Sequence, residues 1–187
     1  MGSALRHRTG VCAPYAGPTR FREWILDVCT ICTRSTSPYL PSWCLDLVTR
    51  GPLHDTGAQT VNWLYQAYMR AGRHADAKRT LALVSGKMNV IEETEYLLLT
   101  QMYSGKVTVA AVTAQMEAAE ETSPETFCTL AYAVGNFHFY SGDKAAAIAL
   151  WKRVLATPSW AAFGYIAAEV ELFNMQGVYP PPGDRRR

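Results

Sequence analysis

Three glycines recur through the middle of the chain, and their spacing constrains the fold more than any other feature. Gly72, Gly105 and Gly142 are separated by 33 and 37 residues, and each follows a stretch with apolar residues at helical intervals. Glycine commonly ends a helix because it readily adopts the left-handed backbone conformation that closes one. A small residue soon afterwards predicts a second helix that crosses closely over the first. An alanine follows each glycine by five residues: Ala77, Ala110 and Ala147.

Glycine, serine–proline and threonine–proline signals divide residues 58–175 into seven expected helices. Ser123 followed by Pro124 marks one start, because serine caps a helix and proline suits its first turn. The sequence therefore predicts an all-α fold, an α–α superhelix of about three helical hairpins closed by a C-terminal capping helix. The expected helices span residues 58–71, 74–85, 91–104, 107–120, 124–141, 143–156 and 159–175.

The two ends of the chain differ from this repeated part. Residues 1–55 hold four of the five cysteines and half of the prolines, and are expected to be irregular or partly helical. Short helices are expected there at about 21–34 and 42–50. The Pro- and Arg-rich tail, 177–187, is expected to be flexible. The predicted organisation is thus an N-terminal segment 1–55, a helical repeat domain 56–176 and the tail.

Composition narrows the partners. Hydrophobic residues make up 49% of the chain, which is enough for a core. No apolar run approaches the ~20 residues of a membrane span, so no membrane-spanning helix is expected. The net charge is +2 and the clearest basic cluster is Arg185–Arg187. Nucleic acid is therefore not an expected partner. No secretory signal is recognisable, which predicts reduced thiols and a cytoplasmic location.

The repeated unit resembles the tetratricopeptide repeat family, whose pattern reads W-x2-L-G-x2-Y…A-x3-F…P. The resemblance covers about residues 58–158. Residues 132–169 are also similar to uncharacterised bacterial tetratricopeptide proteins, a similarity that implies no particular activity. The third repeat fits the pattern best: Ala131-x2-Val134-Gly135-x2-His138, then Ala147-x3-Trp151, then Pro158.

This resemblance implies a protein–protein interaction scaffold or adaptor, because the first helices of such hairpins line a concave groove that binds a peptide or helix. Asn62, Gln66 and Arg70 follow one another at intervals of four residues, so they share one helix face. The amide groups of Asn62 and Gln66 suit the backbone of a bound peptide. The groove residues that the resemblance implies are Gln59, Asn62, Gln66, Arg70, Glu92, Glu95, Met102, Thr129, Tyr132, Asn136 and Tyr140.

Two other functions stay open. One is a self-assembling accessory domain, which would make the chain a homo-oligomer. The other is a Cys-based metal-binding protein, since Cys29 and Cys32 share a helix face and Cys12 and Cys44 could complete a zinc site. Structural zinc sites usually show two close pairs, so small packing residues are favoured instead. No phosphate-binding loop or nucleophile elbow occurs, so no catalytic residue, cofactor, metal or enzymatic activity is expected.

Overall fold

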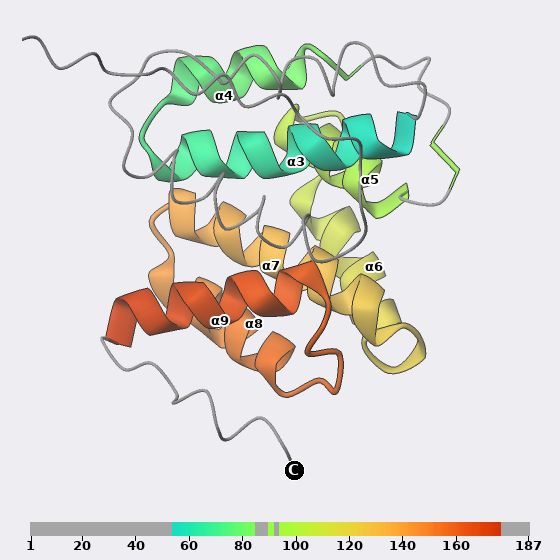
Figure 1. Cartoon of the computed structure of the whole chain (residues 1–187), viewed down its shortest axis with the longest axis vertical. Coiled ribbons are helices and arrows are strands. Elements are labelled where there is room, and N and C mark those ends of the chain that lie inside the picture. The colour runs from blue at the N-terminus through green and yellow to red at the C-terminus, as the bar shows by residue number, and fades with distance from the viewer. Residues whose placement is uncertain (1–53, 85–89, 92–93, 177–187) are drawn as a thin grey trace, which may run out of the picture.

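The computed structural model describes residues 54–84, 90–91 and 94–176, and these form an all-α structure (Figure 1). All seven helices expected in this region are present. The expected helices near residues 21–34 and 42–50, and the tail, lie outside the described residues. The observed helices are α3 (His54–Arg70), α4 (His74–Leu81), α5 (Thr94–Tyr103), α6 (Val109–Thr122), α7 (Pro124–Tyr140), α8 (Lys144–Leu155) and α9 (Phe163–Gln176).

The three repeated glycines end their helices in the same way. Gly72 has a φ of 70°, and Gly105 and Gly142 have φ of 76° and 92°. The N–H of Gly72 donates to the carbonyl of Met69 at 3.1 Å, and the next N–H, that of Arg73, donates to Tyr68 at 2.8 Å. The same two bonds follow the other two glycines. This pair of bonds satisfies carbonyls that the end of a helix leaves open, so the predicted helix ends are confirmed.

The second hairpin departs from the predicted repeat by two residues. In the first and third hairpins the residue after the glycine is already the N-cap of the second helix. In the second, two further residues precede the N-cap, Thr108. The close packing expected at Ala110 is therefore wrong, because this residue is exposed. Val112 occupies the fully buried position four residues after the N-cap, which Ala77 and Ala147 occupy in the other hairpins.

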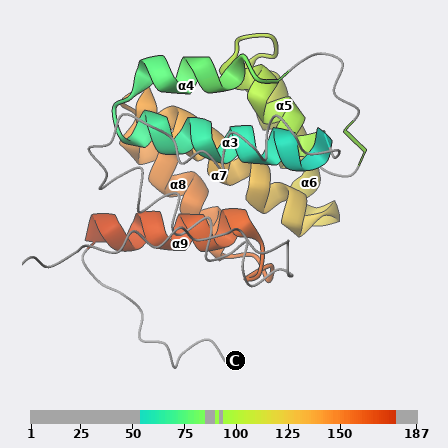
Figure 2. The same ribbon diagram turned by 45° about the horizontal axis from the view of Figure 1, so that its top comes forward.

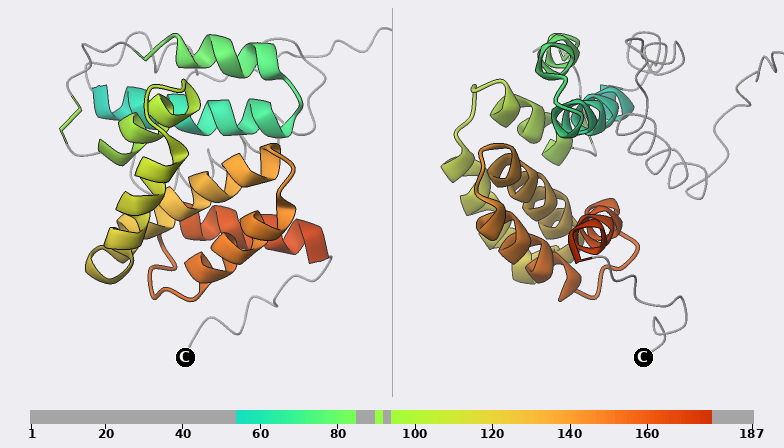
Figure 3. Two further views of the ribbon diagram at one scale, coloured as in Figure 1. Left: turned by 180° about the vertical axis from the view of Figure 1, so that it is seen from behind. Right: turned by 90° about the vertical axis from the view of Figure 1, so that its left-hand side faces the viewer.

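The hairpins also pack unequally. α3 packs along α4 and α7 along α8, whereas α5 and α6 make little contact with each other. α5 packs on α3 instead, and α6 runs along α7, as Figure 3 shows from behind. The all-α prediction is confirmed, but a regular superhelix of three equal hairpins is not, because the second hairpin is open.

Helix α7 is the centre of the described structure, with α6, α8 and α9 packed around it (Figure 2). Trp151 of α8 is fully buried against it, where Gly135 leaves room: a Cβ there would lie 2.4 Å from the indole nitrogen. α9 approaches still more closely, since a Cβ on Gly164 would lie 2.1 Å from the carbonyl oxygen of Cys128. The predicted last helix thus packs closely on α7. No helix in the described part of the chain is long and apolar enough to cross a bilayer.

Candidate functional site

Helices α3 and α9 both contact α7 or its neighbours and run in roughly the same direction (Figure 1). Side chains from both helices come together at two places along the line between them, which we call the α3–α9 seam. Near the N-terminal part of both helices, Gln59 of α3 and Phe163 of α9 line the same pocket. Towards their C-terminal ends the contact is an ion pair between Arg70 and Glu171. One end of this seam therefore holds an open pocket, and the other end is closed by the ion pair.

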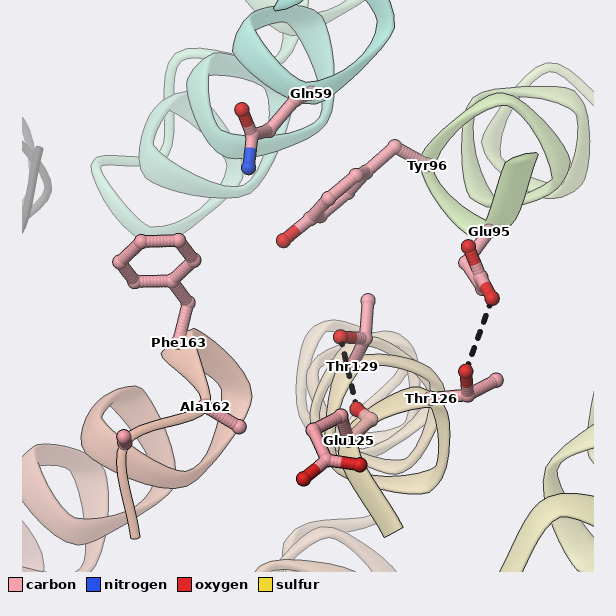
Figure 4. A pocket seen from close by; sticks show the side chains of 9 residues that line it. Gln59, Glu95, Tyr96, Glu125, Thr126, Thr129, Ala162 and Phe163 are labelled. Carbon is pink, nitrogen blue, oxygen red and sulfur yellow. Dashed lines mark hydrogen bonds between the residues drawn. The ribbon is translucent and has the colours of Figure 1, made fainter. Parts of the chain in front are cut away.

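The pocket between α3, α5, α7 and the start of α9 has a volume of about 290 Å³, and we call it the α3–α9 pocket. The amide of Gln59, the hydroxyl of Tyr96 and the ring of Phe163 point into it from three sides (Figure 4). Its lining is mixed, with aromatic, hydroxyl, amide and carboxyl groups. The lining residues are Gln59, Glu95, Tyr96, Glu125, Thr126, Thr129, Ala161, Ala162 and Phe163.

Two carboxylates give the pocket a negative charge. Glu95 accepts a hydrogen bond from the Thr126 hydroxyl at 3.0 Å, and Glu125 accepts one from the Ser159 hydroxyl at 3.1 Å. The Arg ion pairs formed within the described residues use other carboxylates, those of Asp76, Glu117, Glu120 and Glu171. Each pocket carboxylate is thus held by a hydroxyl and keeps acceptor capacity for a cation.

The ion pair at the other end is largely shielded from solvent. The side chains of Arg70 and Glu171 are 20% and 11% exposed, and the Arg70 guanidinium carbon lies 4.0 Å from the centre of the Phe139 ring. Burial raises the pKa of the Glu171 carboxyl, and the neighbouring arginine offsets only part of that rise. Phe139 also packs on Trp151, with ring centres 5.9 Å apart, so the ion pair sits on a packed aromatic base.

The predicted polar stripe of α3 lies inside the protein. Gln66 donates to the side-chain oxygen of Asn62 at 3.0 Å, and Asn136 of α7 donates to the side-chain oxygen of Gln66 at 2.5 Å. The hydroxyls of Tyr103 and Tyr140 donate to Asn62 and to the Gln66 backbone, both at 3.2 Å. The three amide side chains belong to residues at most 3% exposed. They bond to one another across the α3–α7 interface, and of their buried oxygen and nitrogen atoms only Oδ1 of Asn136 has no hydrogen-bond partner among the described residues.

The eleven predicted groove residues therefore divide by environment. Three line the α3–α9 pocket: Gln59, Glu95 and Thr129. Five are buried: Asn62, Gln66, Met102, Tyr132 and Asn136. Arg70 is in the ion pair, Tyr140 is half-buried beside the amide network, and Glu92 lies outside the described residues.

The contacts of Tyr132 show why this predicted groove residue is buried instead. Its ring stacks on Trp63 of α3 at 5.6 Å and tilts against Trp151 of α8 at 6.1 Å. It therefore joins α3 to α8 through α7. Because α3 contacts α7 directly, the part of the inner face that these residues share is covered.

Several pocket residues were not among those predicted: Tyr96, Glu125, Thr126, Ala161, Ala162 and Phe163. Glu125 and Thr126 precede Thr129 by four and three residues, so helical spacing alone places all three on one face. Phe163 begins the last helix, which the repeat pattern assigned to capping rather than to the groove. The repeat pattern therefore gave no signal for this residue.

The described residues contain no group of three or more His, Cys, Asp and Glu side chains that could hold a metal ion. Cys128 is buried, its sulfur lies 3.2 Å from the Thr157 hydroxyl, and burial raises the pKa of its thiol. Such a thiol is a packing group rather than a nucleophile. The cysteines of the alternative zinc site, Cys12, Cys29, Cys32 and Cys44, lie outside the described residues.

The chain matches no protein-family model, no curated protein and no solved structure. The tetratricopeptide resemblance accordingly rests on the residues quoted from the sequence. The candidate site rests on the geometry of the pocket.

Proposed function

We propose that this chain is a protein-interaction module that holds a segment of a partner protein in the α3–α9 pocket. The observation that carries the proposal is a pocket lined by three helices and the start of a fourth, with two carboxylates that form no ion pair within the described residues. Helical hairpin arrays generally bind partners on their inner face. This likeness is an analogy of fold and supports the proposal only in that sense.

The chemistry of the pocket favours a basic side chain. A Lys or Arg head group in the pocket would form charge-assisted hydrogen bonds with the carboxylate of Glu125 or of Glu95. The rings of Tyr96 and Phe163 would face the aliphatic stem and offer cation–π contact. The amide of Gln59 can both donate to and accept from the backbone of the bound segment. Each wall of the pocket thus complements a different part of a bound Lys or Arg residue.

The site suits a short segment, such as a loop or a chain end. Asn62, Gln66 and Asn136 fill the inner face beyond the pocket, and the Arg70–Glu171 ion pair closes the seam. A long extended peptide running the whole length of α3 would require these buried contacts to break. The proposed partner is therefore recognised through a few residues around one cation.

A peptide library tests the proposal. Short random peptides displayed on phage are selected on the full chain and then measured individually by calorimetry. We expect Arg or Lys at one recurrent position, and about a tenfold weaker affinity with Glu95→Gln or Glu125→Gln, which corresponds to about 1.4 kcal/mol. Thr129→Trp, which fills the pocket, is expected to abolish binding.

The matched control is Glu121→Gln, which removes the same charge from an exposed residue that does not line the pocket. It should leave the affinities unchanged. Circular dichroism verifies that each variant is folded. Selected peptides without a shared basic position, or peptides equally weakened by the control, would count against the α3–α9 pocket as the binding site.

Self-assembly is a second candidate, and two exposed side chains favour it. Ile91 and Trp160 are 71% and 65% exposed, and large exposed apolar side chains are common at protein interfaces. Light scattering over a concentration series, with Trp160→Ser as the comparison, separates this function from the first. A molar mass that rises with concentration only in the unsubstituted chain would favour self-assembly.

A further inference from the structure

Because the second hairpin is open, no other described helix packs extensively on the side of α4 that faces away from α3. Among the described helices, α4 packs extensively only on α3. In a stacked array each hairpin packs against the next, so the second helix of the second hairpin would be expected beside α4. Here α6 runs along α7 instead, and Arg153 of α8 holds it there through Glu117 at 2.7 Å and Glu120 at 2.6 Å. The position beside α4 is thus not filled by α6.

A pocket of about 520 Å³ lies at this position, between α3, α4 and the end of α5, and we call it the α4–α5 pocket. Large apolar side chains line it, among them Met69 of α3 and Leu81 of α4. The rings of Tyr65 and Tyr103 stack at 4.2 Å with their planes 14° apart, which gives the pocket a flat aromatic wall. Its volume falls in the range of roughly 300–1,000 Å³ typical of ligand sites.

The charge at this pocket is opposite to that of the α3–α9 pocket. Lys78 of α4 and Lys106 of the α5–α6 turn are exposed and line it, and no Asp or Glu residue does. Neither lysine forms an ion pair with another described residue. A complementary surface is therefore apolar at its centre and acidic beside it.

We propose that the α4–α5 pocket binds an amphipathic helix of a partner protein that carries Asp or Glu beside its apolar stripe. A helix is the element that a stacked array would place beside α4, so the side of α4 that no described helix covers has the shape for one. Apolar residues at i, i+3 or i+4 and i+7 anchor such a helix in a groove. The acidic residues lie against Lys78 and Lys106 and orient it. This surface is separate from the α3–α9 pocket and does not depend on what that pocket binds.

The test uses a labelled helical peptide about 18 residues long, with leucines at i, i+3, i+4 and i+7 and flanking glutamates. Its twin carries lysines in place of the glutamates. Fluorescence anisotropy measures both against the full chain and against the Lys78→Glu, Lys106→Glu double variant. We expect the double variant to bind the acidic peptide at least about tenfold more weakly and the lysine peptide more tightly.

The control carries the same change of net charge elsewhere, as Lys144→Glu with Lys152→Glu on α8, both exposed. It should bind the acidic peptide as the unsubstituted chain does. Equal losses in both double variants, or no binding of the acidic peptide at millimolar concentration, would overturn the proposal. A dimer that dissociates in the Lys78→Glu, Lys106→Glu variant would also overturn it, by making a second copy the occupant. Tighter binding of a synthetic peptide of residues 21–34 would overturn it in favour of the chain's own segment.

Discussion

The side-chain amide of Asn136 on α7 donates to the side-chain oxygen of Gln66 on α3, 70 residues away in the chain. Both residues are buried, at 0% and 3% exposure. This bond joins the first hairpin to the third across the inner face. Asn62 extends the network by accepting from Gln66, so a helix face that looks solvent-exposed in sequence is an internal polar contact.

Breaking this network should cost stability. Asn136→Ala removes the donor to Gln66 and leaves a buried acceptor unsatisfied, which costs about 1–3 kcal/mol. Gln59→Ala lies on the same helix as Gln66 but lines the α3–α9 pocket, and should change the unfolding free energy by less than about 0.5 kcal/mol. Urea denaturation followed by circular dichroism measures both. Equal effects of the two substitutions would show that the amide network is not internal.

The close approach of α9 to α7 predicts a severe effect at one glycine. In Gly164→Ala the new Cβ would lie 2.1 Å from the backbone oxygen of Cys128, so the two helices must separate. Overpacking of this kind typically costs about 1–3 kcal/mol and occasionally more. Thermal unfolding should show a clear drop in melting temperature. Ala149→Gly, at an exposed site in the interior of α8, is the control, with an expected loss of only about 1 kcal/mol from helix propensity. A Gly164→Ala variant as stable as the parent would contradict this packing.

The two-residue shift in the second hairpin predicts opposite outcomes at two alanines that the repeat pattern equates. Ala147 is fully buried, so Ala147→Leu should destabilise the protein by about 1–3 kcal/mol. Ala110 is exposed, so Ala110→Leu should stay within about 0.5 kcal/mol of the parent. Chemical denaturation of the pair decides the register. A large loss at Ala110 would restore the simple repeat alignment.

The buried carboxyl of Glu171 predicts a pH dependence. Its folded-state pKa is raised above its usual value of 4.5, so the stability linked to it is fully present below pH 4.5 and is lost as the pH rises through the folded pKa. Glu171→Gln does not titrate, so its unfolding free energy relative to the parent should increase between about pH 4 and pH 7. Denaturation curves across that range measure the difference. A relative decrease would mean that the attraction of Arg70 exceeds the cost of burial.

The helices and turns could be predicted from the sequence because their determinants are local. Glycine at a left-handed position and Ser123–Pro124 at a helix start act within one turn of chain, and the structure confirms both positions. The expected capping bond from Ser123 is wrong, because its hydroxyl donates to the Thr126 hydroxyl and caps no backbone N–H. The register of the second hairpin could not be predicted in this way, because Lys106 and Val107 lengthen the turn while the glycine that ends α5 stays in place. The distance in the sequence between Gly105 and Ala110 gives no sign of that shift.

The candidate site was predictable only in part, because it depends on tertiary contacts. Helical spacing correctly places Asn62 and Gln66 on one face of α3, but a polar face has the same pattern whether it meets water or an amide on α7. Gln59, at the start of this face, lies in the open pocket, whereas Gln66 is enclosed. The difference follows from the contact of α3 with α7, which no local pattern encodes.

The central claim is that the α3–α9 pocket recognises a basic side chain, and a nuclear magnetic resonance titration tests it most directly. The capped tripeptides Ala-Arg-Ala and Ala-Glu-Ala are added separately to the isotopically labelled full chain. The arginine tripeptide should shift the side-chain amide signal of Gln59 and the backbone signals of Thr126 and Thr129, while the glutamate tripeptide leaves them in place. Glu125→Gln should reduce these shifts. Equal shifts with both tripeptides, or shifts confined to other parts of the chain, would contradict the account.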